Sequence, residues 1–417
     1  MAGALAAALS DPRTALTASA RHSWPQALAT GAAGIALLHI ERARTGHGDW
    51  ETAHRWITTA CAAPITAAAN AGLYMGVPAL AFILHAATSP ARDKAPQQGP
   101  RSSAEDGYRH ALERLDQAAI TLTQTRLDTA HARIHREQRP QLQEFDLIRG
   151  LTGLGVYHLR RHPDHPVTAQ VLQYLVRLTE PGDAPDRWPS WWTLDAPNGE
   201  RDPEFPDGHG NLGASHGISA PLALLSLATL SGVSVSGTRE AIERLCAWTD
   251  KWLQHDDSGP WWPGLLTSDQ IRAGEVDSSL RPRPSWCYGV GGTARAQQLA
   301  ALALGDTRRQ QTAEAAMTTT LSDPVQVGRL TDLGLCHGQA GLLHTAHRMA
   351  ADACTPHLGE RLPNLTNRLL ARLPDPAATC ATTPTLLDGA AGIALALHAV
   401  GNSAVPATGW DAVLAVA

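Results

Sequence analysis

Seven strongly apolar stretches recur along the chain, and each one opens with a short motif that contains glycine. In every copy a glycine is followed by two residues, then by a second glycine or an alanine, and then by an apolar run. Runs such as Ile35–His39 and Ile393–His398 are apolar on nearly every side, which is typical of a buried helix. The pattern predicts seven buried helices, which begin at Gly31–Gly34, Gly76–Ala79, Gly150–Gly153, Gly217–Ala220, Gly289–Gly292, Gly338–Gly341 and Gly389–Gly392.

The spacing of these motifs predicts an array of helical hairpins. Successive copies are 45 to 74 residues apart, and the shortest interval has room for one outer helix, one inner helix and their turns. Periodicity alone leaves open whether seven hairpins form an open solenoid or close into a ring. We expect one domain over residues 1–417. Within it, residues 88–138 form an insertion or an elaborated outer segment, because a Pro- and Gln-rich linker there precedes a polar helical stretch.

Composition supports an all-α protein. Alanine and leucine dominate, whereas the chain has only 3 Phe and 5 Tyr, and 43% of its residues are apolar, which is enough for a large core. The net charge of -5 is spread along the chain, so neither nucleic acid nor an anionic membrane is indicated as a partner. No uninterrupted apolar run is long enough to span a membrane, and six irregularly spaced cysteines suit a reducing compartment, so we expect a cytoplasmic protein.

Two cysteines and a histidine form a candidate metal site. Cys287 stands in the motif Trp286–Gly289, and Cys336 and His337 follow 49 residues later. A catalytic zinc usually takes three such ligands and leaves a fourth position open. The separation is too long for a zinc finger, which favours a catalytic metal on an existing scaffold. The alternative is that both cysteines are small buried residues and that His337 simply begins a helix.

Two Trp- and Pro-rich segments, Trp188–Trp192 and Gly259–Gly264, read as loops. They either cover a bound peptide or are turns pinned by tryptophan packing. Two further sets of residues are expected to be ordinary: the cysteines Cys61, Cys246, Cys354 and Cys380, and the histidines His209, His344 and His347.

Together with Asn211–Gly217, the Trp-Cys-Tyr-Gly and Cys-His-Gly motifs resemble the lanthionine synthetase C-like family, the zinc-dependent lanthipeptide cyclases, over essentially the whole chain. The resemblance implies an α/α toroid of seven inner and seven outer helices, built from the seven hairpin repeats. It implies one Zn²⁺ ion per chain, held by Cys287, Cys336 and His337. Ala79 and Ala220 depart from the motif at its second glycine, so helix packing near them is expected to differ.

The resemblance also points to four candidate catalytic residues, Asp146, His216, Arg283 and Tyr288. His216 titrates near neutrality and is the first candidate for the proton donor, with Asp146 orienting it or helping to accept the thiol proton. Arg283 has a fixed fork of donors that can steady an enolate or a ligating group. Tyr288 is better suited to packing than to acid chemistry. Asp146 as a helix cap and His216 as a capping or core histidine are the structural alternatives.

The implied reaction is the Michael-type addition of a peptide cysteine thiolate to dehydroalanine or dehydrobutyrine, which forms a lanthionine or methyllanthionine ring. The expected partner is a dehydrated precursor peptide with its leader, supplied by a separate dehydratase, and a transporter is a further candidate partner. Two alternatives stay open. One is a zinc-containing relative that adds or binds another thiol such as glutathione. The other is a non-catalytic helical scaffold that binds peptides, in which His216 fills the fourth position of a structural zinc.

Overall fold

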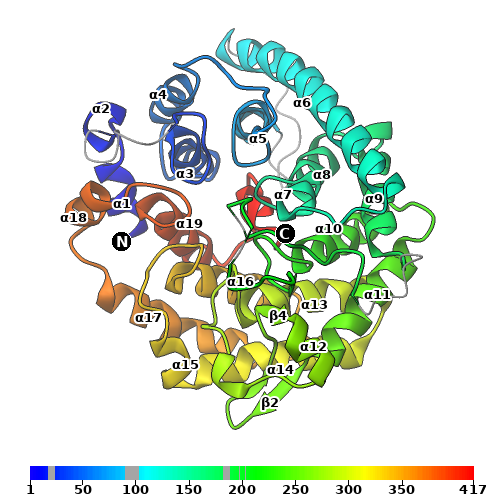
Figure 1. The fold of residues 1–417 in the computed structure, drawn as a ribbon. Helices are drawn as coiled ribbons and strands as arrows, with labels where there is room; N and C mark the ends of the chain where they lie inside the picture. The colour runs from blue at the N-terminus through cyan, green and yellow to red at the C-terminus, as the bar shows by residue number, and fades with distance from the viewer. Residues whose placement is uncertain (17–23, 90–102, 182–187, 197, 202) are drawn as a thin grey trace. The chain divides into compact units, whose positions relative to one another are not determined.

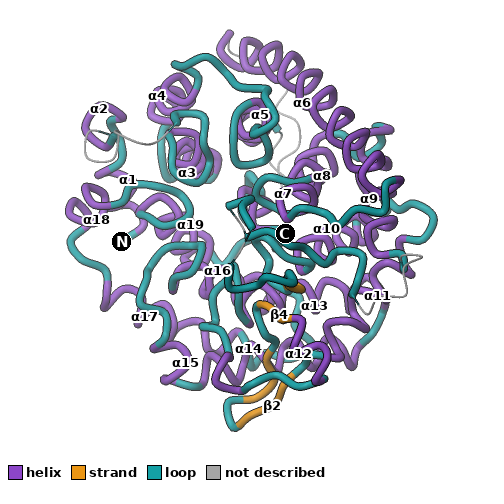
Figure 2. Tube along the Cα trace, viewed as in Figure 1, coloured by secondary structure: helices purple, strands orange, loops and turns teal. Residues whose placement is uncertain are grey.

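The computed structural model describes residues 1–16, 24–89, 103–181, 188–196, 198–201 and 203–417. Nineteen α-helices and four strands of three residues lie in these ranges (Figures 1 and 2), so the predicted helical class is confirmed. Within the same ranges no helix is long and apolar enough to cross a membrane. The linker expected after Thr88 lies largely outside the described residues, and the polar stretch behind it is the single helix α6 (Ser103–His135).

The chain divides into two compact units. The first comprises Met1–Leu122, Asp332–His344 and Asn364–Val413. In this unit α19 contacts both α1 and α3, and α3 contacts α4 and α5 (Figure 1), so the last glycine motif lies beside the first. The helices that lie wholly in this unit are α1 (Ala2–Ala8), α2 (Pro12–Ala15), α3 (Ala32–Arg44), α4 (Trp50–Ala60), α5 (Val77–Thr88), α18 (Pro376–Thr382) and α19 (Ala390–Gly401).

The second unit comprises Thr123–Thr331, Thr345–Pro363 and Leu414–Ala417. Its larger helices pack as consecutive pairs, α8 with α9, α10 with α11 and α13 with α14, as hairpins require. The helices of this unit are α7 (Leu142–Phe145), α8 (Leu151–Arg161), α9 (Pro166–Thr179), α10 (Ser219–Leu230), α11 (Thr238–Lys251), α12 (Ser268–Ala273), α13 (Val290–Leu304), α14 (Thr307–Ser322), α15 (Pro324–Gly328) and the 3-10 helices η1 (Ser278–Leu280) and η2 (Gly359–Arg361).

Two antiparallel strand pairs in this second unit are confined to its loops. Strand β1 (His209–Asn211) pairs with β4 (Leu265–Thr267), and β2 (Gln254–Asp256) pairs with β3 (Gly259–Trp261). Four elements contain residues of both units, namely α6, α16 (Gln339–Ala351), α17 (Leu362–Arg372) and the 3-10 helix η3 (Trp410–Leu414).

The seven predicted helix starts are confirmed. Six of the seven helices begin directly after the first glycine of the motif, and α10 begins two residues after Gly217, in one of the two copies that carry alanine at the second position. Apolar residues of these helices, including Ile35, Leu224 and Leu395, are fully buried. We call these seven elements, α3, α5, α8, α10, α13, α16 and α19, the glycine-start helices, and the residues directly before each one its start loop.

The second glycine of the motif permits a close approach between each glycine-start helix and its own start loop. A Cβ atom placed on Gly34, Gly292 or Gly392 would overlap the carbonyl oxygen of the residue six positions earlier. It would also come within 2.7 Å of a side chain from another repeat, which for Gly34 is Leu386. Close packing therefore requires glycine at this position, because the backbone carbonyl oxygen cannot move aside to make room for a Cβ atom.

Backbone hydrogen bonds join neighbouring start loops in the first unit. The N–H of Leu28 donates to the carbonyl of Tyr74 at 3.0 Å, and the N–H of Leu387 donates to Ala29 at 3.2 Å. The N–H groups of Leu335 and Cys336 both donate to Leu387, at 2.6 and 2.9 Å. These bonds hold the start loops of α16, α19, α3 and α5 in one series.

The second unit contains the corresponding series. The N–H of Leu147 donates to the carbonyl of Ser215 at 3.2 Å, and the N–H of Ala214 donates to Cys287 at 2.9 Å. The start loops of α8, α10 and α13 are thereby fixed against one another, and they carry Asp146, His216 and Cys287.

The tryptophan-rich loops are turns held by packing. Trp191, Trp192, Trp261 and Trp262 are 5%, 1%, 1% and 3% exposed. The interpretation of these rings as an exposed cover over a peptide is therefore wrong for these four. Among the tryptophans of the two segments, Trp188 alone is half-buried. Its ring stacks on that of Trp192, with centroids 4.6 Å apart.

We predict that Gly392→Ala destabilises the protein by about 3 kcal/mol, since the new methyl group overlaps the Leu386 carbonyl. Gly401→Ala in the same helix is the control, because a Cβ there meets no atom within 4 Å, and we expect a change of less than about 1 kcal/mol. Denaturant unfolding measures both. Equal effects of the two substitutions would show that close approach is not what the motif provides.

We also predict acid destabilisation through His39. Burial lowers the pKa of His39 from 6.5 to about 4, although its Nε2 atom lies 3.0 Å from the Leu9 carbonyl. At pH values between 6.5 and about 4, His39 is protonated in the unfolded chain but stays neutral in the folded chain. The free energy of unfolding therefore falls as pH falls through this range. From pH 7 to pH 5 the loss through His39 is about 2 kcal/mol. In His39→Gln the pH-dependent loss should shrink by that amount; an unchanged loss would contradict the assignment.

Candidate metal centre

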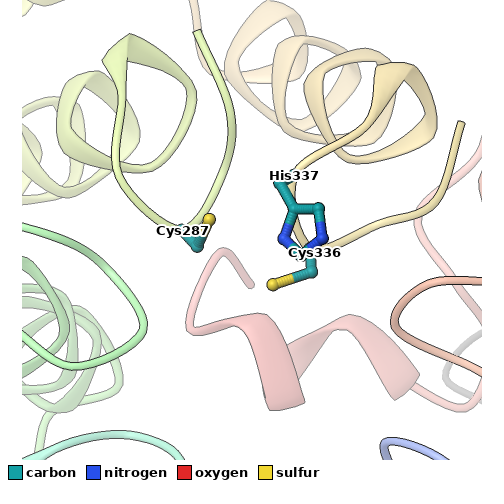
Figure 3. Close-up of side chains that lie close together, drawn as sticks. All are labelled: Cys287, Cys336 and His337. Carbon is teal, nitrogen blue, oxygen red and sulfur yellow. The ribbon is translucent and has the colours of Figure 1, made fainter. Parts of the chain in front are cut away.

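Cys287, Cys336 and His337 form a group of potential metal ligands (Figure 3). Each offers one ligand atom, and these atoms lie within 4.8 Å of one another. A tetrahedral zinc with Zn–S bonds of about 2.3 Å holds two sulfurs roughly 3.8 Å apart, so the donor set and its spacing fit zinc. None of the six cysteines is part of a disulfide bond. Among the described residues this is the group that can hold a metal ion.

The Cys287 loop is fixed from both sides. Trp286, directly before it, is fully buried and its indole N–H donates to the carbonyl of Leu414 at 2.9 Å. The hydroxyl of Ser285 lies 3.4 Å from the Cys287 sulfur. Gly213 permits the start loop of α10 to lie against this one, because a Cβ on Gly213 would come 2.7 Å from the Cys287 carbonyl oxygen. The sulfur of Cys287 is therefore held in place before any metal binds.

Asp388 lies beside His337 and is a residue that sequence reasoning missed. Its Oδ1 atom is 3.4 Å from Nε2 of His337, and both side chains are partly exposed. Gly334 makes this proximity possible, since a Cβ there would lie 2.6 Å from Cα of Asp388. Metal-binding histidines commonly donate their second ring N–H to a carboxylate, which fixes the ring and its tautomer. Asp388 could do this for His337 through Nε2, and Nδ1 would then be the atom that could bind a metal.

Asp146 and His216 form a hydrogen-bonded pair. Oδ2 of Asp146 is 2.6 Å from Nδ1 of His216, while Oδ1 accepts the backbone N–H groups of Arg149 and Gly150, each at 2.7 Å. Asp146 therefore holds the loop before α8 with one oxygen and His216 with the other. The N-cap of α8 is Gly150 and no side chain caps it, so the interpretation of Asp146 as the cap of this helix is wrong. Its carboxylate is buried, whereas the His216 side chain is 18% exposed. His216 is thereby oriented with its Nε2 atom left for another group.

Tyr288 lies against the start loop of α10. Its hydroxyl accepts a hydrogen bond from the side chain of Asn211 at 3.2 Å. Burial, above all, raises the pKa of Tyr288 to about 12, so this phenol stays protonated at neutral pH and can donate a hydrogen bond. Arg283 is half-buried four residues before Cys287, and its carbonyl oxygen accepts the N–H of Ser285 at 2.7 Å. The structure places both residues on the Cys287 loop, and their catalytic roles stay predictions.

The candidate residues share a register. Most of them occupy one of the two positions before the first glycine of consecutive repeats, whereas Asp146 and Arg283 stand four and six positions before that glycine in their own loops. Directly before the glycine stand Arg149, His216, Tyr288, His337 and Asp388, and one position earlier stand Cys287 and Cys336. The repeat alignment was the signal that could have identified Asp388.

The remaining cysteines and histidines have structural surroundings. Burial raises the pKa of Cys246 to about 12 and that of Cys380 to about 11, so both stay protonated thiols. His344 is fully buried, 3.0 Å from Asp411, with its ring 4.6 Å from that of Trp410. These surroundings agree with the expectation that such residues are ordinary.

Comparison with known proteins agrees with this arrangement. The family model described as lanthionine synthetase C-like protein matches residues 22–414. A solved structure described as nisin cyclase is similar to this chain with a TM-score of 0.76 and 18% sequence identity, over 95% of this chain and 93% of that chain. At this identity the likeness shows a shared fold. No curated protein matches the chain in sequence.

We predict that Asp388→Asn weakens zinc binding about tenfold or more, because the histidine ligand loses the carboxylate that orients its ring. Competition with a chromophoric chelator gives the affinity directly, without any turnover. Asp128→Asn, at an exposed position of α6, is the control and should bind zinc as the unmodified protein does. Unchanged affinity in Asp388→Asn would remove this residue from the metal centre.

Proposed function

Because the chain belongs to the lanthionine synthetase C-like family, we propose that it is a zinc-dependent cyclase that forms lanthionine or methyllanthionine rings in a dehydrated peptide. The observation that carries this proposal is the three-ligand group Cys287, Cys336 and His337. His216 is absent from this group and is paired with Asp146 instead. Three protein donors and an open fourth position are typical of a catalytic zinc rather than of a structural one, and they leave room for a substrate thiol.

Zinc in this group would supply Lewis acidity that keeps a substrate cysteine as a thiolate at neutral pH. The two cysteine ligands contribute negative charge, which preserves the nucleophilicity of that thiolate. Cys287 is buried at 6% exposure, whereas Cys336 and His337 are half-buried.

His216 is the proposed proton carrier. With its Nδ1–H donated to Asp146, its Nε2 atom can accept the proton that the substrate thiol releases and return it to the α-carbon after the thioether bond forms. The proton lost from sulfur equals the proton gained by carbon, so no further reactant is needed. Asp146 takes part by holding the imidazole in one tautomer and by stabilising its protonated form.

Arg283 and Tyr288 are proposed to stabilise the enolate that forms when sulfur adds to the β-carbon. A guanidinium offers fixed donors to the developing charge, and a phenol that stays protonated can donate one hydrogen bond. Both residues stand on the loop that carries Cys287, so they would act close to the reacting sulfur.

We further propose that the hairpins close into an α/α toroid of seven inner and seven outer helices. The contact of α19 with α3 and the hydrogen bond from Leu387 to Ala29 support this, since an open solenoid keeps its first and last repeats apart. The proposed partners are a precursor peptide with its leader, a separate dehydratase and a transporter, in the cytoplasm.

The proposal is tested with a model peptide that contains one cysteine and one dehydroalanine. Mass spectrometry after alkylation of the remaining thiol separates the cyclised from the open form. We expect Cys336→Ala to lose both zinc and cyclisation. We expect His216→Ala to keep zinc and to cyclise 10²- to 10⁴-fold more slowly, since it lacks the proton carrier.

His357→Ala, at an exposed position, is the control and should cyclise normally. Full activity in His216→Ala would remove His216 from the mechanism. Addition of glutathione to the peptide without ring closure would indicate a different thiol substrate. Zinc binding without any reaction would indicate a helical scaffold.

A further inference from the structure

A cavity lies in the unit that contains Asp146 and His216. It is a cavity of about 730 Å³, formed where α6 and α9 end and where α11 passes them. Arg133 lines it from α6, Thr179 from the end of α9, and Arg244 and Trp248 from α11. Its volume is in the range of cavities that hold small ligands or short peptide segments. None of the candidate catalytic residues or metal ligands lines it, so it needs an explanation of its own.

The described lining is positively charged, with four arginines and two glutamates. Arg177 and Glu180 pair with each other at 3.1 Å, and Arg133 pairs with Glu144. Arg244, unlike these arginines, is bound to a hydroxyl rather than to a carboxylate. Its Nε and Nη2 atoms both donate to the hydroxyl of Thr179, at 3.2 and 3.0 Å, and among the described residues no carboxylate lies within ion-pair distance of it. A guanidinium held by a hydroxyl keeps its full charge and its outer donors for an anion.

Tryptophan side chains make the same cavity apolar. Trp188, Trp191 and Trp248 line it, and the rings of Trp191 and Trp248 meet edge to face with centroids 5.8 Å apart. The indole N–H groups of both are buried and have no acceptor among the described residues. Trp188 and Trp248, which are half-buried, present ring surface that suits an apolar side chain.

The cavity is connected to the candidate catalytic pair. Arg133 in its wall binds Glu144 of α7 at 2.6 Å, and the Tyr174 hydroxyl donates to the same carboxylate at 2.8 Å. Two residues later comes Asp146, which holds His216. A ligand in the cavity would therefore contact Arg133, which is joined by its ion pair with Glu144 to the segment that positions the pair. This favours the reacting peptide as the occupant over an unrelated metabolite.

We propose that this cavity binds an acidic segment of the substrate peptide outside the ring being formed, with a carboxylate on Arg244 and a neighbouring apolar side chain against Trp188 and Trp248. The inference rests on the proposed peptide-cyclase function. It adds a specificity site for the part of the peptide that does not react. Among the described lining residues arginines outnumber glutamates, and Arg244 is held by a hydroxyl rather than by a described carboxylate, so a carboxylate is favoured over a neutral amide.

The first test measures binding by fluorescence anisotropy with a labelled heptapeptide, Gly-Ala-Leu-Glu-Leu-Ala-Gly, and its counterpart with Gln in place of Glu. The unmodified protein should prefer the Glu peptide, and Arg244→Gln should weaken binding of that peptide about tenfold without affecting the Gln peptide. Arg239→Gln is the matched control on the same helix, because Arg239 pairs with Glu243 and does not line the cavity.

Zinc-free Cys336→Ala should bind the Glu peptide as the unmodified protein does. The proposal is overturned if both peptides bind equally, if Arg244→Gln binds the Glu peptide normally, or if binding disappears with the zinc ligand.

The second test uses two cyclisation substrates with the same cysteine and dehydroalanine, one of them extended by the Glu-containing segment. In Arg244→Gln the KM of the extended substrate should rise about tenfold to that of the short one, with kcat unchanged. Anisotropy needs neither zinc nor turnover. Binding without cyclisation would therefore reject the enzyme and keep the acidic-peptide site, whereas cyclisation with no effect of Arg244→Gln would reject the site and keep the enzyme.

Discussion

The structure depends on one constraint, the close packing of each glycine-start helix on its own start loop and on the next repeat. At Gly34, Gly292 and Gly392 no side chain fits, because backbone carbonyl oxygens occupy the space. Once the helices approach this closely, the start loops lie near enough for backbone hydrogen bonds such as Leu387 to Ala29 and Ala214 to Cys287. The result in each unit is a rigid edge made of consecutive loops. Side chains on that edge are placed by backbone bonds rather than by their own contacts.

Within each unit, this rigid edge explains how residues far apart in sequence come to lie on neighbouring loops. The two positions before each first glycine carry the chemistry, with thiols at Cys287 and Cys336 and imidazoles at His216 and His337. Asp146 uses one oxygen to hold the loop before α8 and the other to orient His216. The same carboxylate therefore serves both the loop before α8 and the orientation of His216, so the geometry of the proposed catalytic pair follows from how the helices begin.

Much of this was predictable from the sequence, for a physical reason. A glycine that opens an apolar run leaves a local signal, so all seven helix starts were predicted, and the residue types at Cys287, Cys336 and His337 identify a zinc donor set by chemistry alone. Asp388 was missed because a single acidic residue before a glycine has no distinctive pattern until the repeats are aligned.

The cavity beside Arg244 was also not predictable, since its wall combines segments from α6, α9 and α11. The sequence also did not predict the buried contacts of the C-terminal segment, because their partners are far away in the chain. Leu414 and Val416 accept hydrogen bonds from Trp286 and Arg295, partners more than a hundred residues away.

The central claim is that Cys287, Cys336 and His337 hold a zinc ion whose fourth position takes a substrate thiol. The most direct measurement is elemental analysis of the purified protein combined with zinc-edge X-ray absorption, before and after addition of a cysteine-containing dehydrated peptide. The account predicts one zinc per chain with two sulfur ligands, rising to three when the peptide binds. Absence of zinc, or a sulfur count that does not change with peptide, would contradict it.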